Sequence, residues 1–204
     1  MSITASMVKT LREKTGVGMM ECKKALMETQ GNLEQAQDYL RKKGLADASK
    51  RSGRSTSEGI IESYIHMGGQ IGVMVELNCE TDFVARNDQF KGLARDIAMH
   101  IAAAAPEYVS KDEVPEAIVN KEKEILMAQA DMASKPENIR EKIIAGRIDK
   151  FYEQVCLLNQ PFIKDPDTTV EDMIKRAIST MGENIRVQRF VRFGLGESDS
   201  SSAE

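Results

Sequence analysis

Only three segments of the 204-residue chain alternate apolar and polar residues in the way that β-strands do. Two of them, residues 59–67 and 70–78, flank the pair Gly68-Gly69, which is typical of a two-residue hairpin turn. The third covers residues 185–193. Three strands form a narrow sheet that is only marginally stable alone, so helices must supply most of the packing. The pattern therefore predicts an α+β fold with a three-stranded antiparallel sheet.

Helical periodicity is strong at the beginning of the chain. Three short helical patterns lie within residues 4–44, separated by turns at Gly16 and Gly31. The third has charges suited to the C-terminal end of a helix and is expected to end at Gly44. We therefore predict a three-helix bundle over residues 1–45.

Residue composition and the spacing of apolar residues divide the rest of the chain into five segments. The segment after the bundle is rich in Gly, Ser and Thr, which indicates a linker. A helix from Asn87 to Ala104 is expected to cover one face of the sheet, and two helical stretches, 116–133 and 136–157, are expected to form an antiparallel hairpin. The predicted parts are a linker at 46–58, a core hairpin and helix at 59–113, a helical arm at 114–164, a core helix and final strand at 165–194, and a tail without fixed structure at 195–204.

A three-stranded sheet with helices on one face leaves its other face and its edges uncovered. Such a surface must be covered by a second copy of the chain or by another partner. The residues alone leave both possibilities open.

Groups that carry out enzyme chemistry are scarce. The chain has two histidines, His66 and His100, and three separated cysteines without a C-x-x-C pair, which argues against a metal site, a Cys/His nucleophile and a disulfide framework. The cysteines are expected to be small buried residues. No stretch approaches the roughly 18 apolar residues that span a bilayer, and the N-terminus lacks a signal-peptide pattern. We expect a cytoplasmic protein that is not an enzyme, holds no metal and needs no cofactor.

The residues alone also bear on two kinds of binding site, a phosphate-binding loop and a nucleic-acid-binding surface. Gly16-Val17-Gly18 invites comparison with a phosphate loop, but no strand precedes it and no Lys-Ser/Thr pair follows it. The net charge of -4 is too acidic for a protein that coats nucleic acid. The basic residues between Lys42 and Arg54 nevertheless leave one alternative, a nucleic-acid or ribosome-binding module.

The segment from Glu80 to Asn87 connects the second strand to the long helix. It places an acid, a large aromatic residue and a base close together in a connecting loop, where function is often found. Two interpretations of Phe83 are possible: it fills the core, or it is an exposed aromatic wedge for a partner.

Two stretches together resemble a known family. Residues 11–26 (LREKTGVGMMECKKAL) and 76–87 (ELNCETDFVARN) are similar to the two signatures of the translation elongation factor Ts family. Members of that family are guanine-nucleotide exchange factors for the GTPase elongation factor Tu. The resemblance implies that the N-terminal bundle is a ubiquitin-associated-like module, that the arm is a coiled coil, and that elongation factor Tu is the protein partner.

The resemblance also implies which residues act. The family's loop that dislocates Mg²⁺ from the partner's nucleotide site corresponds to Thr81, Asp82, Phe83 and Val84. Its partner contacts correspond to Arg12, Met19, Met20 and His66. Core packing remains an alternative for Met19, and a solvated or core position remains an alternative for His66.

The chain departs from many family members in one respect. Those members have two related sheet subdomains, whereas this sequence has room for one hairpin-helix-strand unit. It therefore resembles a short form, in which two copies pair to complete the core and bind the partner as a two-to-two complex.

Overall fold

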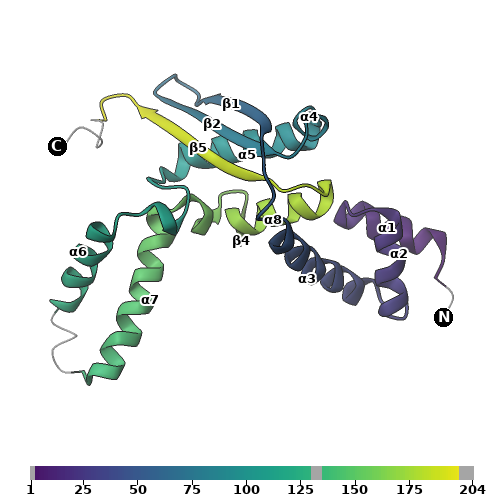
Figure 1. Ribbon diagram of the computed structural model, residues 1–204, viewed down its shortest axis with the longest axis horizontal. Coiled ribbons are helices and arrows are strands. Elements are labelled where there is room, and N and C mark those ends of the chain that lie inside the picture. The colour runs from purple at the N-terminus through teal and green to yellow at the C-terminus, as the bar shows by residue number, and fades with distance from the viewer. Residues whose placement is uncertain (1–2, 130–134, 198–204) are drawn as a thin grey trace. The chain divides into compact units, whose positions relative to one another are not determined.

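The structure is a computed structural model that describes residues 3–129 and 135–197. The strands β1, β2 and β5 form a three-stranded antiparallel sheet in the order β1-β2-β5, and β3 pairs with β4 (Figure 1). The α+β prediction is confirmed. The described helices and strands are α1 (Ala5–Thr15), α2 (Met19–Glu28), α3 (Leu33–Arg51), β1 (Glu58–Ile65), β2 (Ile71–Cys79), α4 (Asp82–Ala85), α5 (Asp88–Ala104), α6 (Glu116–Met127), α7 (Glu137–Val155), β3 (Pro161–Phe162), β4 (Asp165–Thr169), α8 (Val170–Met181) and β5 (Arg186–Gly194), with short 3-10 helices at Lys111–Glu113 and Leu157–Asn159.

The described residues divide into two compact units. The first comprises the described parts of Met1–Ile61, Glu76–Ala94 and Asp172–Arg186. The second comprises the described parts of Glu62–Val75, Arg95–Glu171 and Val187–Glu204. None of the described helices is long and apolar enough to cross a bilayer.

In the first unit, α1, α2 and α3 form the predicted three-helix bundle. The hydroxyl oxygen of Thr4 accepts a hydrogen bond from the backbone N–H of Met7, and the side chain of Asn32 caps α3 in the same way. Gly16 ends α1 at φ +68°, a left-handed conformation that favours glycine. The core of the bundle consists of Val8, Leu11, Cys22, Ala25, Leu26, Ala36 and Leu40.

The predicted end of α3 at Gly44 is wrong, because the helix continues to Arg51. Gly44 is buried against α8, and a Cβ atom at this position would lie 2.7 Å from the Ser179 hydroxyl oxygen. The glycine therefore allows the close approach of a second helix and does not end its own. Ala48, also buried, continues the packed face into the segment predicted as a linker.

In the second unit, the predicted hairpin is confirmed, but its predicted two-residue turn is wrong, because His66 pairs with Ile71 and residues 67–70 form a longer loop. Gly68 and Gly69 both have positive φ angles, and the backbone N–H of His66 donates to the carbonyl of Ile71 across the turn at 2.9 Å. On β5, the Nε of Arg192 donates to the carbonyl of Ala102 near the end of α5 at 3.4 Å. This bond places the Arg192 side of the strand against the helix.

The helical arm of the second unit consists of α6 and α7, which lie side by side (Figure 1). Leu126 of α6 is buried against Ile144 and Ile148 of α7. Helix α7 begins at Glu137, close to the predicted start at residue 136, and it packs against α6 as the predicted antiparallel hairpin requires. The classification of this arm as a coiled coil stays a prediction. The first arm helix was predicted to reach residue 133, which is wrong, because α6 ends at Met127. Residues 130–134, and residues 198–204 of the predicted tail, lie outside the described residues.

Strands β3 and β4 were not predicted. They form a short hairpin in which Phe162 pairs with Asp165 and Pro161 with Thr169. Strand β3 has only two residues, and β4 has the sequence DPDTT, in which no apolar residue alternates with the polar ones. Helix α8 and strand β5 lie where a core helix and a final strand were predicted, within residues 165–194.

His100 of α5 is fully buried in the second unit. Its Nδ1 accepts a hydrogen bond from the backbone N–H of Ile163 at 3.3 Å, so its Nε2 carries the proton and donates to the Gln160 side-chain oxygen at 2.9 Å. Both bonds require the neutral imidazole with this tautomer. Burial lowers the pKa of His100, although the Gln160 bond acts in the opposite direction.

We expect His100 to make the chain less stable in mild acid. Because its pKa is lower in the folded state than in the unfolded state, the unfolded chain binds a proton first as the pH falls below about 6.5. Urea unfolding at about pH 7.5 and about pH 5.5 should show a loss of stability that is smaller in His100→Gln. The exposed His66→Gln is the control and should lose as much as the wild type. An equal loss in the His100 variant would contradict this assignment.

The three cysteines are buried and free of disulfides, as predicted. Burial, together with the nearby Glu183 carboxylate, raises the pKa of Cys79 to about 11, and burial raises that of Cys156 to about 11. These thiols stay protonated at neutral pH and are poor nucleophiles.

Candidate functional site

The loop after β2 forms a single-turn helix, α4, whose largest side chain points into solvent. Phe83 is 81% exposed, whereas Ala85 on the same turn is buried. The interpretation of Phe83 as a core residue is therefore wrong. An aromatic side chain this exposed on a fixed turn is available for contact with another molecule.

Thr81 fixes the start of this turn. Its hydroxyl oxygen accepts from the backbone N–H of Val84 at 3.5 Å and so caps α4. The same hydroxyl donates its proton to Glu183 Oε1 at 2.6 Å. Thr81 thus connects the turn that carries Phe83 to the segment between α8 and β5.

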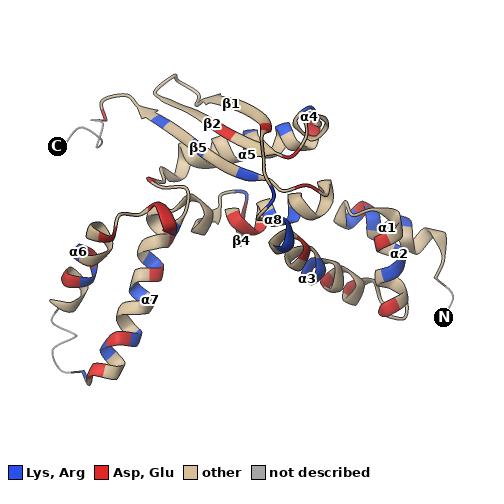
Figure 2. Cartoon of the chain, in the orientation of Figure 1, with Lys and Arg blue, Asp and Glu red and all other residues tan. Residues whose placement is uncertain are grey.

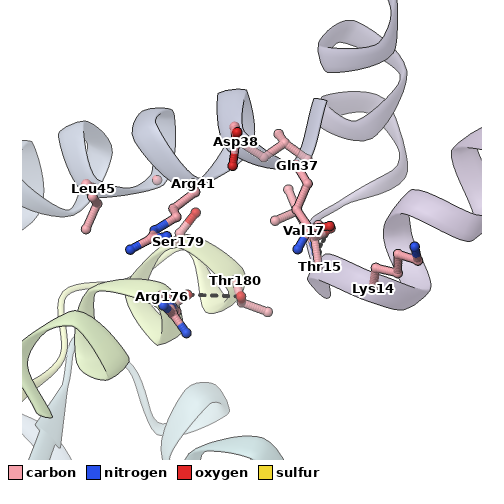
Figure 3. Close-up of a pocket in the computed structure, with 12 residues that line it drawn as sticks. Lys14, Thr15, Val17, Gln37, Asp38, Arg41, Leu45, Arg176, Ser179 and Thr180 are labelled. Carbon is pink, nitrogen blue, oxygen red and sulfur yellow. Dashed lines mark hydrogen bonds between the residues drawn. The ribbon is translucent and has the colours of Figure 1, made fainter. Parts of the chain in front are cut away.

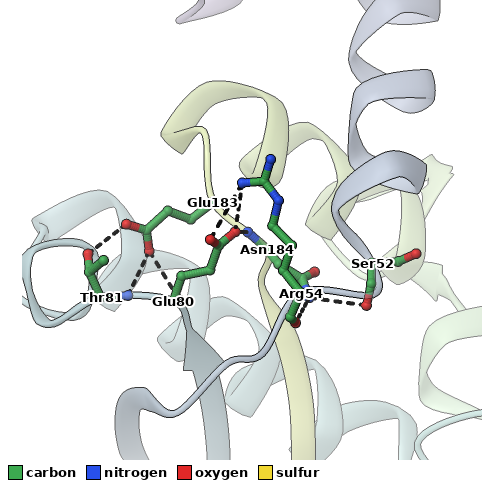
Figure 4. A network of polar contacts seen from close by, with 6 residues as sticks. All are labelled: Ser52, Arg54, Glu80, Thr81, Glu183 and Asn184. Atoms are coloured by element: carbon green, nitrogen blue, oxygen red, sulfur yellow. Dashed lines mark hydrogen bonds and ion pairs between the residues drawn. The ribbon is translucent and has the colours of Figure 1, made fainter.

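Glu183 and Glu80 form a reciprocal clasp between these two segments (Figure 4). Glu183 Oε2 accepts from the backbone N–H groups of Glu80 and Thr81 at 3.1 and 3.0 Å. In return, Glu80 Oε1 accepts from the backbone N–H of Asn184 at 2.6 Å. Each carboxylate therefore satisfies backbone donors of the other segment.

The clasp also includes the segment that follows α3. The Asn184 side chain donates to the backbone carbonyls of Ser52 and Arg54 at 3.2 and 2.9 Å, and it is 3% exposed. The Arg54 guanidinium pairs with Glu80 at 3.4 Å. Residues about 130 positions apart in the sequence therefore meet within the first unit.

Neither Glu183 nor Asn184 is predicted as a site residue from the sequence. They follow a helix in a short turn, and no local pattern distinguishes this acid from the other surface acids of the chain. They lie about 100 positions from Thr81 along the sequence, so their hydrogen bonds to this loop cannot be recognised from neighbouring residues.

Asp82 is the one charged residue of the predicted Thr81–Val84 loop. Its carboxylate pairs with Arg86 at 3.0 Å, four residues along the chain, and both side chains are substantially exposed. Exposed pairs of this kind contribute little to stability. The carboxylate is therefore free to exchange its own arginine for a group on another molecule.

The other predicted contact residues lie on the surface. Met19 and Met20, at the start of α2, are 44% and 67% exposed, so the core alternative for Met19 is wrong. Arg12, in the last turn of α1, is also exposed. Together with the Thr81–Val84 loop, these residues belong to the first unit.

His66 belongs to the second unit and is exposed at the end of β1. Its Nδ1 lies 3.1 Å from the Tyr64 hydroxyl oxygen. The core alternative for His66 is wrong, and the solvated alternative agrees with this position.

Three of the basic residues near the end of α3 have acidic partners. Lys43 pairs with Glu21, Lys50 with Asp47 at 3.8 Å, and Arg54 with Glu80. The Lys43 and Lys24 side chains lower the pKa of Glu21. Figure 2 shows that acidic residues (red) and basic residues (blue) are interspersed along the α3 ribbon. The helix therefore does not present the uniform basic surface that phosphate binding favours.

A cleft of about 260 Å³ lies in the first unit, between α1, α3 and α8 (Figure 3). Three cationic residues, Lys14, Arg41 and Arg176, and one acid, Asp38, line it. Both α1 and α8 end at this cleft, near Thr15 and Thr180. Helix C-termini carry partial negative charge, which such cations ordinarily complement. Asp38 and the two helix ends thus offset part of the positive charge of the cleft.

Known proteins match almost the whole chain. A family model described as Elongation factor TS matches residues 48–197. A protein from Geobacter sulfurreducens named Elongation factor Ts is 61% identical over 197 residues, which cover 97% of this chain and 91% of the relative. Proteins of the same name from Carboxydothermus hydrogenoformans and Alkaliphilus oremlandii are each 57% identical, over 99% and 100% of this chain and 93% and 94% of their own lengths. The chain therefore belongs to the elongation factor Ts family.

Proposed function

We propose that the chain is a guanine-nucleotide exchange factor that binds elongation factor Tu·GDP and promotes release of GDP, so that GTP can bind. Its membership of a family of translation elongation factors supports this function. The observation that carries it is the exposed Phe83 on a turn whose first residue is held by Glu183. A fixed, exposed aromatic side chain is suited to enter a pocket on a partner.

The proposed mechanism has two parts. Burial of Phe83 in the partner contributes roughly 1.5–3 kcal/mol, which helps to hold apart the elements that support the partner's Mg²⁺. Asp82, once exchanged from Arg86, disturbs the polar network around the ion, which requires near-ideal octahedral geometry. Thr81 and Val84 form the turn that presents both side chains. No covalent bond is made or broken, so the chain acts by binding and not as an enzyme.

Exchange requires coupling between two binding equilibria. If the chain weakens nucleotide binding by some factor, nucleotide weakens binding of the chain by the same factor. A 10⁴-fold effect needs about 5.5 kcal/mol of differential affinity. Phe83 alone does not supply this, so the exposed Arg12, Met19, Met20 and His66 are proposed to provide further contacts. The thioether side chains are suited to an adaptable apolar interface.

The test of this function is release of a fluorescent GDP analogue from elongation factor Tu, measured by stopped flow with increasing amounts of the wild-type chain. We expect a saturable acceleration that excess Mg²⁺ reduces, because the ion and the chain oppose each other at the nucleotide site. A release rate that does not change with the chain would overturn the exchange function. Salt-dependent binding to RNA without any exchange would favour the alternative nucleic-acid module.

The homodimer is part of this proposal, and the uncovered sheet face supports it. Arg192 contacts α5, so its neighbours Val191 and Phe193 point to the other face of the sheet. Ile65 of β1 lies on that same face over Gly72 of β2, because a Cβ added to Gly72 would be 3.1 Å from the Ile65 Cδ1 atom. Met74 is two residues after Gly72 on the same strand, so its side chain is also on this face. All four apolar side chains are exposed, and Phe193 is 60% exposed. A second copy that covers this face would remove them from water and complete a two-to-two complex with elongation factor Tu.

We expect Phe193→Asp to convert a dimer into a monomer at micromolar concentration. A carboxylate buried in an apolar interface without a partner is strongly unfavourable. Sedimentation velocity measures the change directly, and Met27→Asp, an exposed methionine on the N-terminal bundle, is the matched control that should remain dimeric. Sedimentation of the wild type as a monomer under these conditions would contradict the homodimer.

A further inference from the structure

We infer that Glu183 is a positioning residue for exchange, which acts through Thr81 to hold α4 so that Phe83 is presented in one orientation. The inference rests on the proposed exchange function. It assigns a role to a residue outside the loop and outside both motifs that carry the family resemblance. The geometry of the clasp carries it.

The Glu183 carboxylate accepts three hydrogen bonds from the start of the loop. One oxygen accepts two consecutive backbone N–H groups, from Glu80 and Thr81, and the other accepts the Thr81 hydroxyl. Hydrogen bonds to an ionised acceptor are the stronger kind. Three such bonds fix both the backbone and the side chain of Thr81.

The third bond determines the direction of the Thr81 hydroxyl. A hydroxyl has one proton, and here that proton points to Glu183 at 2.6 Å. The lone pairs of the oxygen are then left to accept the Val84 N–H, which is the bond that caps α4. Glu183 therefore makes Thr81 an acceptor toward the helix.

Glu183 is itself held in place. Its neighbour Asn184 is buried and donates three hydrogen bonds: its backbone N–H to Glu80, and its side chain to the carbonyls of Ser52 and Arg54. The carboxylate is thus presented from a fixed platform, as Figure 4 shows. A residue on a fixed platform positions another residue more effectively than one on a mobile chain.

Such support matters because α4 is a single turn. One helical turn fixes several backbone angles for few hydrogen bonds and is unstable alone. Phe83 is exposed, so core packing does not hold it in the free chain. Without Glu183 the loop would populate other conformers, and only the fraction with the correct conformation would act on the partner.

The first test compares Glu183→Gln with the wild type in the GDP-release assay over a full concentration range. The substitution keeps the size of the side chain but replaces one accepting oxygen by a donor that faces other donors. We expect the maximal release rate to fall about tenfold, with a smaller change in the half-saturating concentration, because the contacts of the N-terminal bundle remain. Glu28→Gln removes an exposed acid outside the clasp and is expected to behave as the wild type.

A second variant guards against misfolding of the turn between α8 and β5. Thr81→Val removes the hydroxyl from the loop side and leaves that turn unchanged, and it should lower the maximal rate in the same way. The Thr81→Val/Glu183→Gln double variant should lose less than the sum of the two single effects, because both remove one interaction. In a Phe83→Ala background, Glu183→Gln should have little further effect.

A third measurement does not use the partner. The chain has no tryptophan, so Phe83→Trp introduces a single fluorescent reporter at the wedge. Time-resolved anisotropy should show a larger fast component of nanosecond motion when Glu183→Gln is added. Thermal unfolding of the same samples checks that the fold is retained.

The outcomes separate this inference from the function on which it rests. If the wild type does not accelerate GDP release, the exchange function is overturned and the role of Glu183 in it falls as well. If the wild type accelerates release, and Glu183→Gln leaves both the maximal rate and the reporter anisotropy unchanged, only the positioning role is overturned. A reduced maximal rate with increased reporter motion supports it.

Discussion

Phe83→Ala is expected to remove most of the acceleration of GDP release from elongation factor Tu. Loss of a buried phenyl group costs roughly 1.5–3 kcal/mol, which corresponds to a fall of roughly 10- to 100-fold in the release rate at saturation. The folded chain itself should be unaffected, because Phe83 contributes nothing to the core. The measurement is stopped-flow release of fluorescent GDP at several concentrations of the variant, with circular dichroism as the check on folding.

Met27→Ala is the matched control for Phe83→Ala. It truncates another large exposed apolar side chain of the first unit, at the opposite end of α2 from Met19 and Met20. It should accelerate release as the wild type does. Asp82→Ala is expected to lower the rate as well, because it removes the carboxylate proposed to disturb the Mg²⁺ site. If Phe83→Ala and Asp82→Ala bind and accelerate normally, the assignment of the wedge is wrong.

Leu11→Ala is expected to unfold the N-terminal bundle. Leu11 is fully buried, and truncation of a buried leucine costs about 2–5 kcal/mol. A bundle of this size has a small core and a stability of only a few kcal/mol, so the loss is comparable with the whole. Hydrogen exchange of the full chain should show rapid exchange throughout α1, α2 and α3. Amides of α5, on the other hand, should remain protected.

Leu11→Ala also distinguishes the proposed binding of the partner by the bundle from the proposed stimulation of GDP release by α4. The bundle carries Arg12, Met19 and Met20, whereas α4 carries Phe83. We therefore expect Leu11→Ala to raise the half-saturating concentration in the GDP-release assay by more than about tenfold, with a smaller effect on the maximal rate. Lys9→Ala, on the exposed side of α1, is the control and should change neither. A normal half-saturating concentration with an unfolded bundle would show that these contacts do not anchor the partner.

Much of the fold follows from local sequence signals. The Gly68-Gly69 hairpin, the glycine at the end of α1 and the Asn32 cap each depend on residues within a few positions of one another. The end of α3 was predicted incorrectly because Gly44 has two opposite meanings in a helix, a terminator or a close contact. Only the presence of Ser179 on another helix decides between them.

The site was accessible to sequence analysis only in part. Thr81–Val84 follow from the family resemblance, whereas the residues alone left open whether Phe83 is buried or exposed. The exposure is decided by Ala85, which faces inward in its place. Glu183 and Asn184 could not be found because their partners lie more than 100 positions away. Long-range hydrogen bonds of this kind leave no periodic pattern in a sequence.

The convergence of Ser52, Glu80 and Asn184 has a consequence for the synthesis of the protein itself. A chain leaves the ribosome N-terminus first, and domains generally fold in that order. The core of the bundle formed by α1, α2 and α3 lies within residues 8–40, so the bundle can fold soon after these residues leave the ribosome. The clasp, in contrast, needs Glu183 and Asn184, which are synthesised more than 100 residues after Glu80. A nascent chain would therefore form its bundle before the clasp could fix the turn that carries Phe83.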